Sequence, residues 1–135
     1  MHGRVVVFGN FVADVIAKPL ERLPERGQLL ILDTIQTHVG GNAPNTAGAL
    51  GKLGESVSVG GRVGLDPYGD FLLAQLAGWG VETGPVLRDP EAATGVTLVA
   101  VDRTGERSFL HHFGANAAVT AADLNWDMVA DASHF

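Results

Sequence analysis

The chain has no cysteine among its 135 residues, and this absence excludes disulfide bonds and zinc sites built on thiolates. Basic residues are also scarce, with 9 lysines and arginines against 15 acidic residues. The resulting net charge of −6 disfavours binding to nucleic-acid phosphates, so we expect no nucleic-acid partner. Because a disulfide framework is missing, residence in the cytoplasm is the simplest expectation.

Several longer patterns are missing as well. No run of about 18 apolar residues occurs, so we expect neither a membrane-spanning helix nor a membrane partner. The first residues lack the apolar stretch and cleavage site of a signal peptide. The glycine-containing segment 9–13 does not match G-x-G-x-x-G, and no Gly-Lys-Ser or Gly-Lys-Thr loop is present. These absences exclude the dinucleotide-binding and P-loop nucleotide-binding patterns.

The apolar residues that are present predict a fold in which strands alternate with helices. Residues 4–9 form a continuous apolar run ended by glycine, typical of a central strand buried on both faces. Residues 29–39 mix polar and apolar positions, which predicts a partly exposed strand, and 56–64 predicts another strand. Residues 94–101 and 107–113 flank a glycine-containing turn and predict a β-hairpin. The order indicates an α/β sheet with additional strands.

Two helices are predicted from their capping residues and glycine stops. Asn42 or Ala43 is expected to cap the first helix, which ends at Gly54. The second begins at Asp66 and Pro67 and carries a core-facing stripe. The members of this stripe are Leu72, Leu76 and Trp79.

The C-terminal part of the chain predicts one more helix and the start of another strand. Residues 120–123 match a capping box, so a last helix is expected from Leu124 to about Asp131. Residues 133–135 resemble the first residues of a further strand. We therefore expect the sheet to continue beyond Phe135.

The segment 40–47 is the most informative of the chain, because it ends a strand and opens a helix with two glycines and two asparagines. Gly40 and Gly41 allow the backbone to approach a ligand closely. Asn45, one turn into the helix, presents both a donor and an acceptor. These residue types favour a polyol as the ligand.

Five segments of the chain, in this order, resemble the ribokinase-like (PfkB) carbohydrate kinase family. They are Asp14 after Gly9, then residues 40–47, 61–70, 94–98 and 114–118. The resemblance extends from Arg4 to the last residue. It implies a Rossmann-like, three-layer α/β sheet of the ribokinase type with a small β-lid.

The resemblance also implies an activity. Such kinases transfer the γ-phosphoryl group of ATP, with Mg²⁺, to a hydroxymethyl group of a sugar or nucleoside. Family members are much longer, and their catalytic aspartate lies in a Gly-Ala-Gly-Asp motif that this chain lacks, as it lacks the family's Asn-x-x-Glu motif. Residues 1–135 are thus expected to be the N-terminal part of one domain, with lid strands at about 15–39 and 94–113. Alone, this substrate-binding half is expected to be inactive.

The residues that match the family's substrate site can be named individually. Asp14 matches an aspartate that binds substrate hydroxyls, while Gly40 and Gly41 match glycines whose backbone lies against the sugar. Asn45 matches an asparagine that contacts hydroxyls. The positions that match the lid over the substrate are Thr97, Val99 and His111. The resemblance assigns no catalytic, cofactor-binding or metal-binding residue to this chain.

Two departures from the family pattern leave the substrate open. Val12 stands where ribokinases have an asparagine, and Asn42 replaces a lysine. The first change removes a polar contact and makes the expected pocket more apolar. Nucleosides, modified sugars and sugar acids therefore all remain candidate substrates.

The histidines and two of the aspartates have simpler explanations than a metal site or an acid–base pair. His38, His111 and His112 do not predict a metal site, because adjacent histidines in a strand point to opposite faces. Asp66 and Asp70 are better explained as a helix cap and a first-turn charge than as an acid–base pair. As an alternative function, the chain could be a non-catalytic sugar-binding module or one that forms a homodimer through its lid strands.

Overall fold

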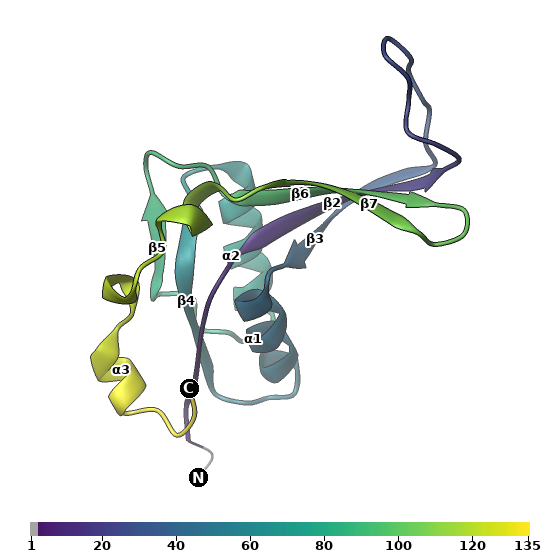
Figure 1. Ribbon diagram of the computed structural model, residues 1–135. Coiled ribbons are helices and arrows are strands. Elements are labelled where there is room, and N and C mark those ends of the chain that lie inside the picture. The colour runs from purple at the N-terminus through teal and green to yellow at the C-terminus, as the bar shows by residue number, and fades with distance from the viewer. Residues whose placement is uncertain (1–2) are drawn as a thin grey trace.

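The computed structural model describes residues 3–135 and contains two β-sheets that project away from each other (Figure 1). We call them the central sheet and the projecting sheet. The central sheet is parallel, in the order β1-β4-β5, and consists of β1 (Val5–Phe8), β4 (Val57–Gly64) and β5 (Val86–Asp89). The projecting sheet is mixed, in the order β3-β2-β6-β7. Its strands are β2 (Val12–Leu20), β3 (Thr34–Gly40), β6 (Gly95–Asp102) and β7 (Arg107–His112).

Helices lie on both sides of the central sheet and complete a three-layer α/β arrangement, as predicted (Figure 1). On one side are α1 (Asn42–Lys52) and α2 (Pro67–Gly78). On the other side are the 3₁₀ helices η1 (Gly114–Ala118) and η2 (Ala121–Asp123), followed by α3 (Trp126–Ala130).

The core lies between the central sheet and the helices α1 and α2. Val59 and Val63 of β4 point toward α2, where Leu72 and Leu76 are fully buried. These two leucines belong to the predicted apolar stripe, which is confirmed. Asp66 caps α2 as predicted, because its side chain accepts a hydrogen bond from the backbone N–H of Gly69 at 2.9 Å.

The position of β1 also agrees with its sequence pattern. On one side β1 pairs with β4, and on the other Val5 forms a parallel bridge with His134. The backbone N–H of Val6 donates to the carbonyl oxygen of His134 at 3.0 Å. Thus β1 is flanked on both sides, and an isolated bridge at His134 lies where the strand at 133–135 was predicted.

The structure corrects the expected strands in three places. β3 starts at Thr34, so the prediction of a strand from Leu29 was wrong for 29–33, which lie outside any strand. β5 was missed, and β2 was not predicted from its own pattern, although the resemblance implied lid strands at about 15–39. β2 is difficult to recognise because Asp14 and the Lys18-Pro19 pair interrupt its apolar pattern, and proline is unfavourable inside a sheet. Its formation depends on pairing with β3 and β6, which are distant in sequence.

The helix boundaries need three corrections. Gly41, rather than Asn42 or Ala43, is the N-cap of α1. The capping box at Thr120 is present, but it caps the N-terminus of the short 3₁₀ helix η2 and not that of a long α-helix. The last helix is only the five-residue α3, which is capped by Asn125, because its side chain accepts from the backbone N–H of Met128.

Candidate substrate-binding site

Asp14 lies in the middle of the projecting sheet, where it pairs with residues of both neighbouring strands. Its partners are His38 in β3 and Thr97 in β6. Residues paired directly across a sheet point to the same face. Gly40 lies on this face too, and a Cβ atom there would overlap the Asp14 carboxylate. Glycine at position 40 therefore provides the space that the Asp14 side chain occupies.

Gly41 forms the turn between β3 and α1. Its φ of 92° lies in the left-handed region, and a Cβ atom there would overlap the carbonyl oxygen of Asn10. Asn42 fixes the same turn, because its Oδ1 accepts hydrogen bonds from the backbone N–H groups of Asn10 at 2.8 Å and Ala43 at 2.9 Å. The residue that replaces the expected lysine thus joins the end of β1 to the start of α1.

Asn45 is exposed in the first turn of α1. Its backbone N–H donates to the carbonyl oxygen of Gly41 at 3.2 Å, so the helix begins directly after the two glycines. The structure thereby places Asn45 at the same end of α1 as Gly40 and Gly41.

Thr97, Val99 and His111 lie on the Asp14 side of the projecting sheet. Thr97 pairs with His111, and Val99 pairs with Phe109. The Thr97 hydroxyl lies 2.9 Å from Nδ1 of His111. The His111 ring also meets the ring of Phe113 edge to face, with centroids 4.7 Å apart. Two contacts therefore hold this exposed imidazole in place.

Together these residues form what we call the Asp14 face of the projecting sheet. It consists of a polar row beside an apolar row. The polar row is His38, Asp14, Thr97 and His111, and in the other row Gln36 of β3 is followed by the apolar residues Ile16, Val99 and Phe109. His38 was not among the expected site residues, although alternation along β3 was the signal that could have placed it here.

Asn116, in the matched segment 114–118, connects η1 to the start of β2. Its Oδ1 accepts from the backbone N–H of Phe11 at 2.9 Å, and its Nδ2 donates to the Phe11 carbonyl at 2.8 Å. Nδ2 also donates to the carbonyl oxygen of Phe113 at 3.0 Å. The side chain is buried, so these bonds hold the junction of the two sheets together.

Asp66 and Thr94 join the matched segments 61–70 and 94–98. Asp66 Oδ2 accepts from the backbone N–H of Thr94, and Oδ1 accepts from its hydroxyl, both at 2.7 Å. Burial alone would raise the pKa of Asp66, but the hydrogen bonds from Thr94 and Gly69 outweigh burial and hold that pKa below its usual value. Asp66 is therefore a structural carboxylate.

Arg62 forms a half-buried charge cluster with Asp89 and Asp123, away from the Asp14 face. Its Nε and Nη2 bind both carboxylate oxygens of Asp123, at 3.0 and 2.9 Å, and its Nη1 binds Asp89 at 3.0 Å. The guanidinium holds the pKa of Asp123 below its usual value. This cluster attaches η2 to β4 and β5.

Neither a cluster of metal-ligating side chains nor a membrane-spanning helix occurs among the residues that the structure describes. Within residues 3–135, no group of three or more histidine or acidic side chains is arranged to hold a metal ion. In the same described part of the chain, no helix is long and apolar enough to cross a bilayer.

Solved structures with the same arrangement define the class of protein. A ribokinase from Arabidopsis thaliana, complexed with ribose and ATP, superposes with a TM-score of 0.85 at 30% identity, over 98% of this chain and 44% of that one. A fructokinase from Xylella fastidiosa with bound ATP gives a TM-score of 0.78 at 28% identity, over 97% of this chain and 40% of that one. The fold is that of the ribokinase-type sugar kinases, and this chain is part of it.

The family follows from the sequence comparison. The model of the pfkB family of carbohydrate kinases matches residues 2–135, and the chain belongs to this family. A deoxyribokinase from Salmonella typhi is 28% identical over 121 residues, which are 90% of this chain and 39% of that protein. The chain thus spans about 40% of the length of the curated relatives it matches. Membership confirms the predicted kinase family and does not favour a purely non-catalytic module.

Proposed function

We propose that this chain is the substrate-binding half of an ATP-dependent sugar or nucleoside kinase. The main support for this proposal is the Asp14 face. There the Asp14 carboxylate lies against Gly40, and Thr97 and His111 lie in the same row as Asp14. The projecting sheet would act as the lid over the substrate. Cytoplasmic residence stays a prediction.

Each residue of the site has a distinct proposed role. The ionised Asp14 carboxylate accepts hydrogen bonds from substrate hydroxyls and orients the ring or chain. Gly40 and Gly41 present backbone without side chains, so that the substrate can approach closely. Asn45 adds one amide contact, while Thr97, Val99 and His111 cover the substrate and exclude water.

The chemical step needs groups that residues 1–135 do not provide. In the complete enzyme, ATP and Mg²⁺ would supply the phosphoryl group and neutralise its charge. The chain has no Gly-Ala-Gly-Asp motif, and residues 3–135 contain no group of three or more histidine or acidic side chains arranged to hold a metal ion. We therefore propose that the chain alone binds and orients but does not phosphorylate.

A paired assay tests this proposal. We expect no ATP-dependent phosphorylation of sugars or nucleosides by the chain alone, because the base and the anion site account for many orders of magnitude in rate. Titration calorimetry should still detect binding of a polyol, and Asp14→Asn should weaken it about tenfold or more. Turnover by the chain alone would contradict the proposed inactivity, and binding that ignores Asp14→Asn would contradict the proposed site.

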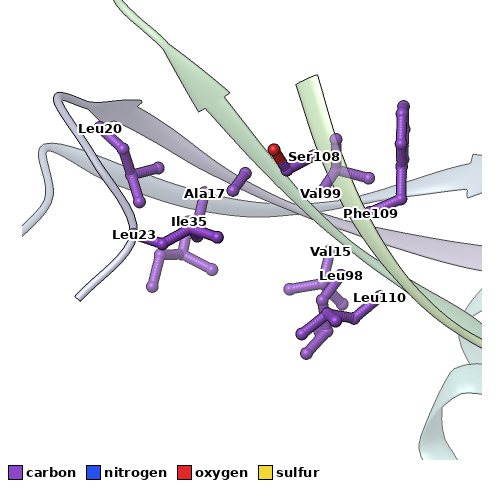
Figure 2. A pocket seen from close by; sticks show the side chains of 11 residues that line it. Val15, Ala17, Leu20, Leu23, Ile35, Leu98, Val99, Ser108, Phe109 and Leu110 are labelled. Atoms are coloured by element: carbon purple, nitrogen blue, oxygen red, sulfur yellow. The ribbon is translucent and has the colours of Figure 1, made fainter. Parts of the chain in front are cut away.

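We also propose that the projecting sheet pairs with that of a second copy, alongside its role as a lid. The face opposite the Asp14 face, which we call the Leu110 face, is apolar and surrounds a hollow of about 350 Å³. Figure 2 shows Val15, Leu98 and Leu110 pointing to the same side there. Ile35 and Leu110 are 66% and 72% exposed, and exposed apolar patches of this kind mark interaction sites.

Light scattering over a range of concentrations tests this pairing. We expect a dimer that Leu110→Glu converts to a monomer, since the charge would be buried in the interface. Leu53→Glu is the matched control, because Leu53 is 78% exposed but lies at the end of α1. A wild-type monomer at high concentration, or a dimer unaffected by Leu110→Glu, would defeat the pairing.

A further inference from the structure

The imidazole of His111 lies within hydrogen-bonding distance of a buried hydroxyl on the Asp14 face, and this contact constrains which ring nitrogen can donate. Within residues 3–135, the Thr97 hydroxyl bonds only His111 Nδ1, at 2.9 Å, and Thr97 is only 9% exposed. A buried hydroxyl that donates to no acceptor is costly. Donation from Thr97 to Nδ1 avoids that cost.

Donation from Thr97 to Nδ1 determines which ring nitrogen of His111 carries the hydrogen. When Nδ1 of a neutral imidazole accepts, Nε2 carries the hydrogen. His111 is exposed, so Nε2–H is a donor accessible to a ligand. The edge-to-face contact with Phe113 restricts the ring further, and the donor is thus positioned before any ligand arrives.

His38, at the other end of the polar row, differs in this respect. Its Nε2 lies 3.3 Å from Oε1 of Gln36, two residues away in β3. Because an amide oxygen only accepts, His38 donates within its own strand. The accessible donor of the row is therefore at the β7 end.

Asp14 and His111 lie two strands apart in the row, because β6 separates β2 from β7. At about 4.8 Å per strand, their backbones are roughly 10 Å apart. A span of this size is comparable with the length of one sugar. Such a ligand would meet an acceptor at Asp14 and a donor at His111.

We propose that His111, oriented by Thr97, selects a sugar acid: Asp14 binds its hydroxyls, and Nε2–H of His111 binds its carboxylate. A carboxylate makes the strongest use of an imidazole, since the hydrogen bond becomes charge-assisted. The inference rests on the proposed function of the Asp14 face and names the substrate class for it.

The test compares binding of D-gluconate and D-sorbitol, which differ at one end by a carboxylate against a hydroxymethyl group. Calorimetry on the full chain should give about tenfold tighter binding of gluconate. His111→Phe should bring the ratio close to one, and Thr97→Val should lower it. His111→Gln should preserve part of the preference, because its amide keeps a donor near the Nε2 position.

His112→Phe is the matched control, because His112 is also an exposed histidine of β7 but lies on the opposite face. Its gluconate preference should equal that of the unchanged protein. Equal affinities for the two ligands, or a preference that survives His111→Phe, overturn the inference. If sorbitol still binds in a manner that needs Asp14, the proposed function stands; if neither ligand binds, the sugar-acid inference fails, and the proposed function is decided separately by its own binding assay with Asp14→Asn.

Discussion

The strand β4 of the central sheet and the strand β7 at the edge of the projecting sheet form a contrast between a packed strand and an exposed one. All but one of the eight residues of β4 are buried, whereas all six residues of β7 are exposed. Helices cover the central sheet on both sides, and the projecting sheet extends beyond them (Figure 1). The first sheet thus supplies stability, and the second leaves both of its faces for binding.

The largest expected effect is on the packed side of this contrast. Leu72→Ala should lower the free energy of unfolding by about 3 kcal/mol, since Leu72 is fully buried between α2 and β4. Urea denaturation measures the change. The control is Phe109→Ala in β7, on the Asp14 face and outside the proposed dimer interface, where the side chain is 60% exposed and a change of only about 0.5 kcal/mol is expected. Similar losses in both variants would remove the contrast.

The junction of the two sheets should respond almost as strongly. Asn116→Ala leaves the backbone N–H and carbonyl of Phe11 without their buried partner, and should cost about 2 kcal/mol. Hydrogen exchange should show where the effect is concentrated, at the start of β2. Asn125→Ala removes only an exposed cap of the short α3 and should cost less. Unchanged exchange at Phe11 would contradict the proposed role of the junction.

The turn from the projecting sheet into α1 gives a more moderate prediction. Gly41→Ala forces a side chain into the left-handed region and against the carbonyl of Asn10, and should cost about 2 kcal/mol. Gly54→Ala is the matched control, since its φ is 84° but nothing lies within 4 Å of a Cβ atom there. It should cost about 1 kcal/mol. Thermal unfolding compares the two, and equal costs would show that the Asn10 contact is unimportant.

The smallest effect concerns pH. Arg62 lowers the pKa of Asp123 in the folded protein, so the contribution of this pair is present at neutral pH. It should be lost as the pH falls below the ordinary value of 3.8 and through the lower folded-state pKa. Asp123→Asn should therefore be less stable at pH 7 and show a flatter decline in acid, measured by urea denaturation at a series of pH values. An identical acid profile would contradict the role of the pair.

The parts of the fold that were predicted correctly have local signals. The α2 helix has an aspartate cap, a proline and an apolar stripe within a few residues. The hairpin of β6 and β7 turns at Gly105, whose φ is 92°. Each of these features depends on residues that are close together in the sequence, so a short stretch of sequence is enough to recognise it.

The elements that were missed have distant partners instead. β2 contains Asp14 and Pro19, which are poor strand residues, and forms because β3 and β6 pair with it. The capping box at Thr120 was recognised, but the helix that begins there is short. Its Asp123 also binds Arg62, a contact 61 positions away in the sequence. A pattern within a short stretch of sequence does not reveal a contact between residues so far apart.

The candidate site divides in the same way. Asp14, Gly40, Gly41 and Asn45 were named from the resemblance to the family and from the motif at 40–47, and their role in binding stays a prediction. His38 was passed over, since its relation to Asp14 is a cross-strand pairing between β3 and β2. Similarly, only the pairing of β6 with β7 brings the Thr97 hydroxyl to His111.

By itself, the sequence determined the kinase family, the alternation of strands and helices and the glycine-rich turn before α1. These depend on residue type and short spacing, which act locally. The tertiary structure alone decided which residues share the Asp14 face and which the Leu110 face. That outcome depends on strand register, because a shift of one residue would exchange the two faces.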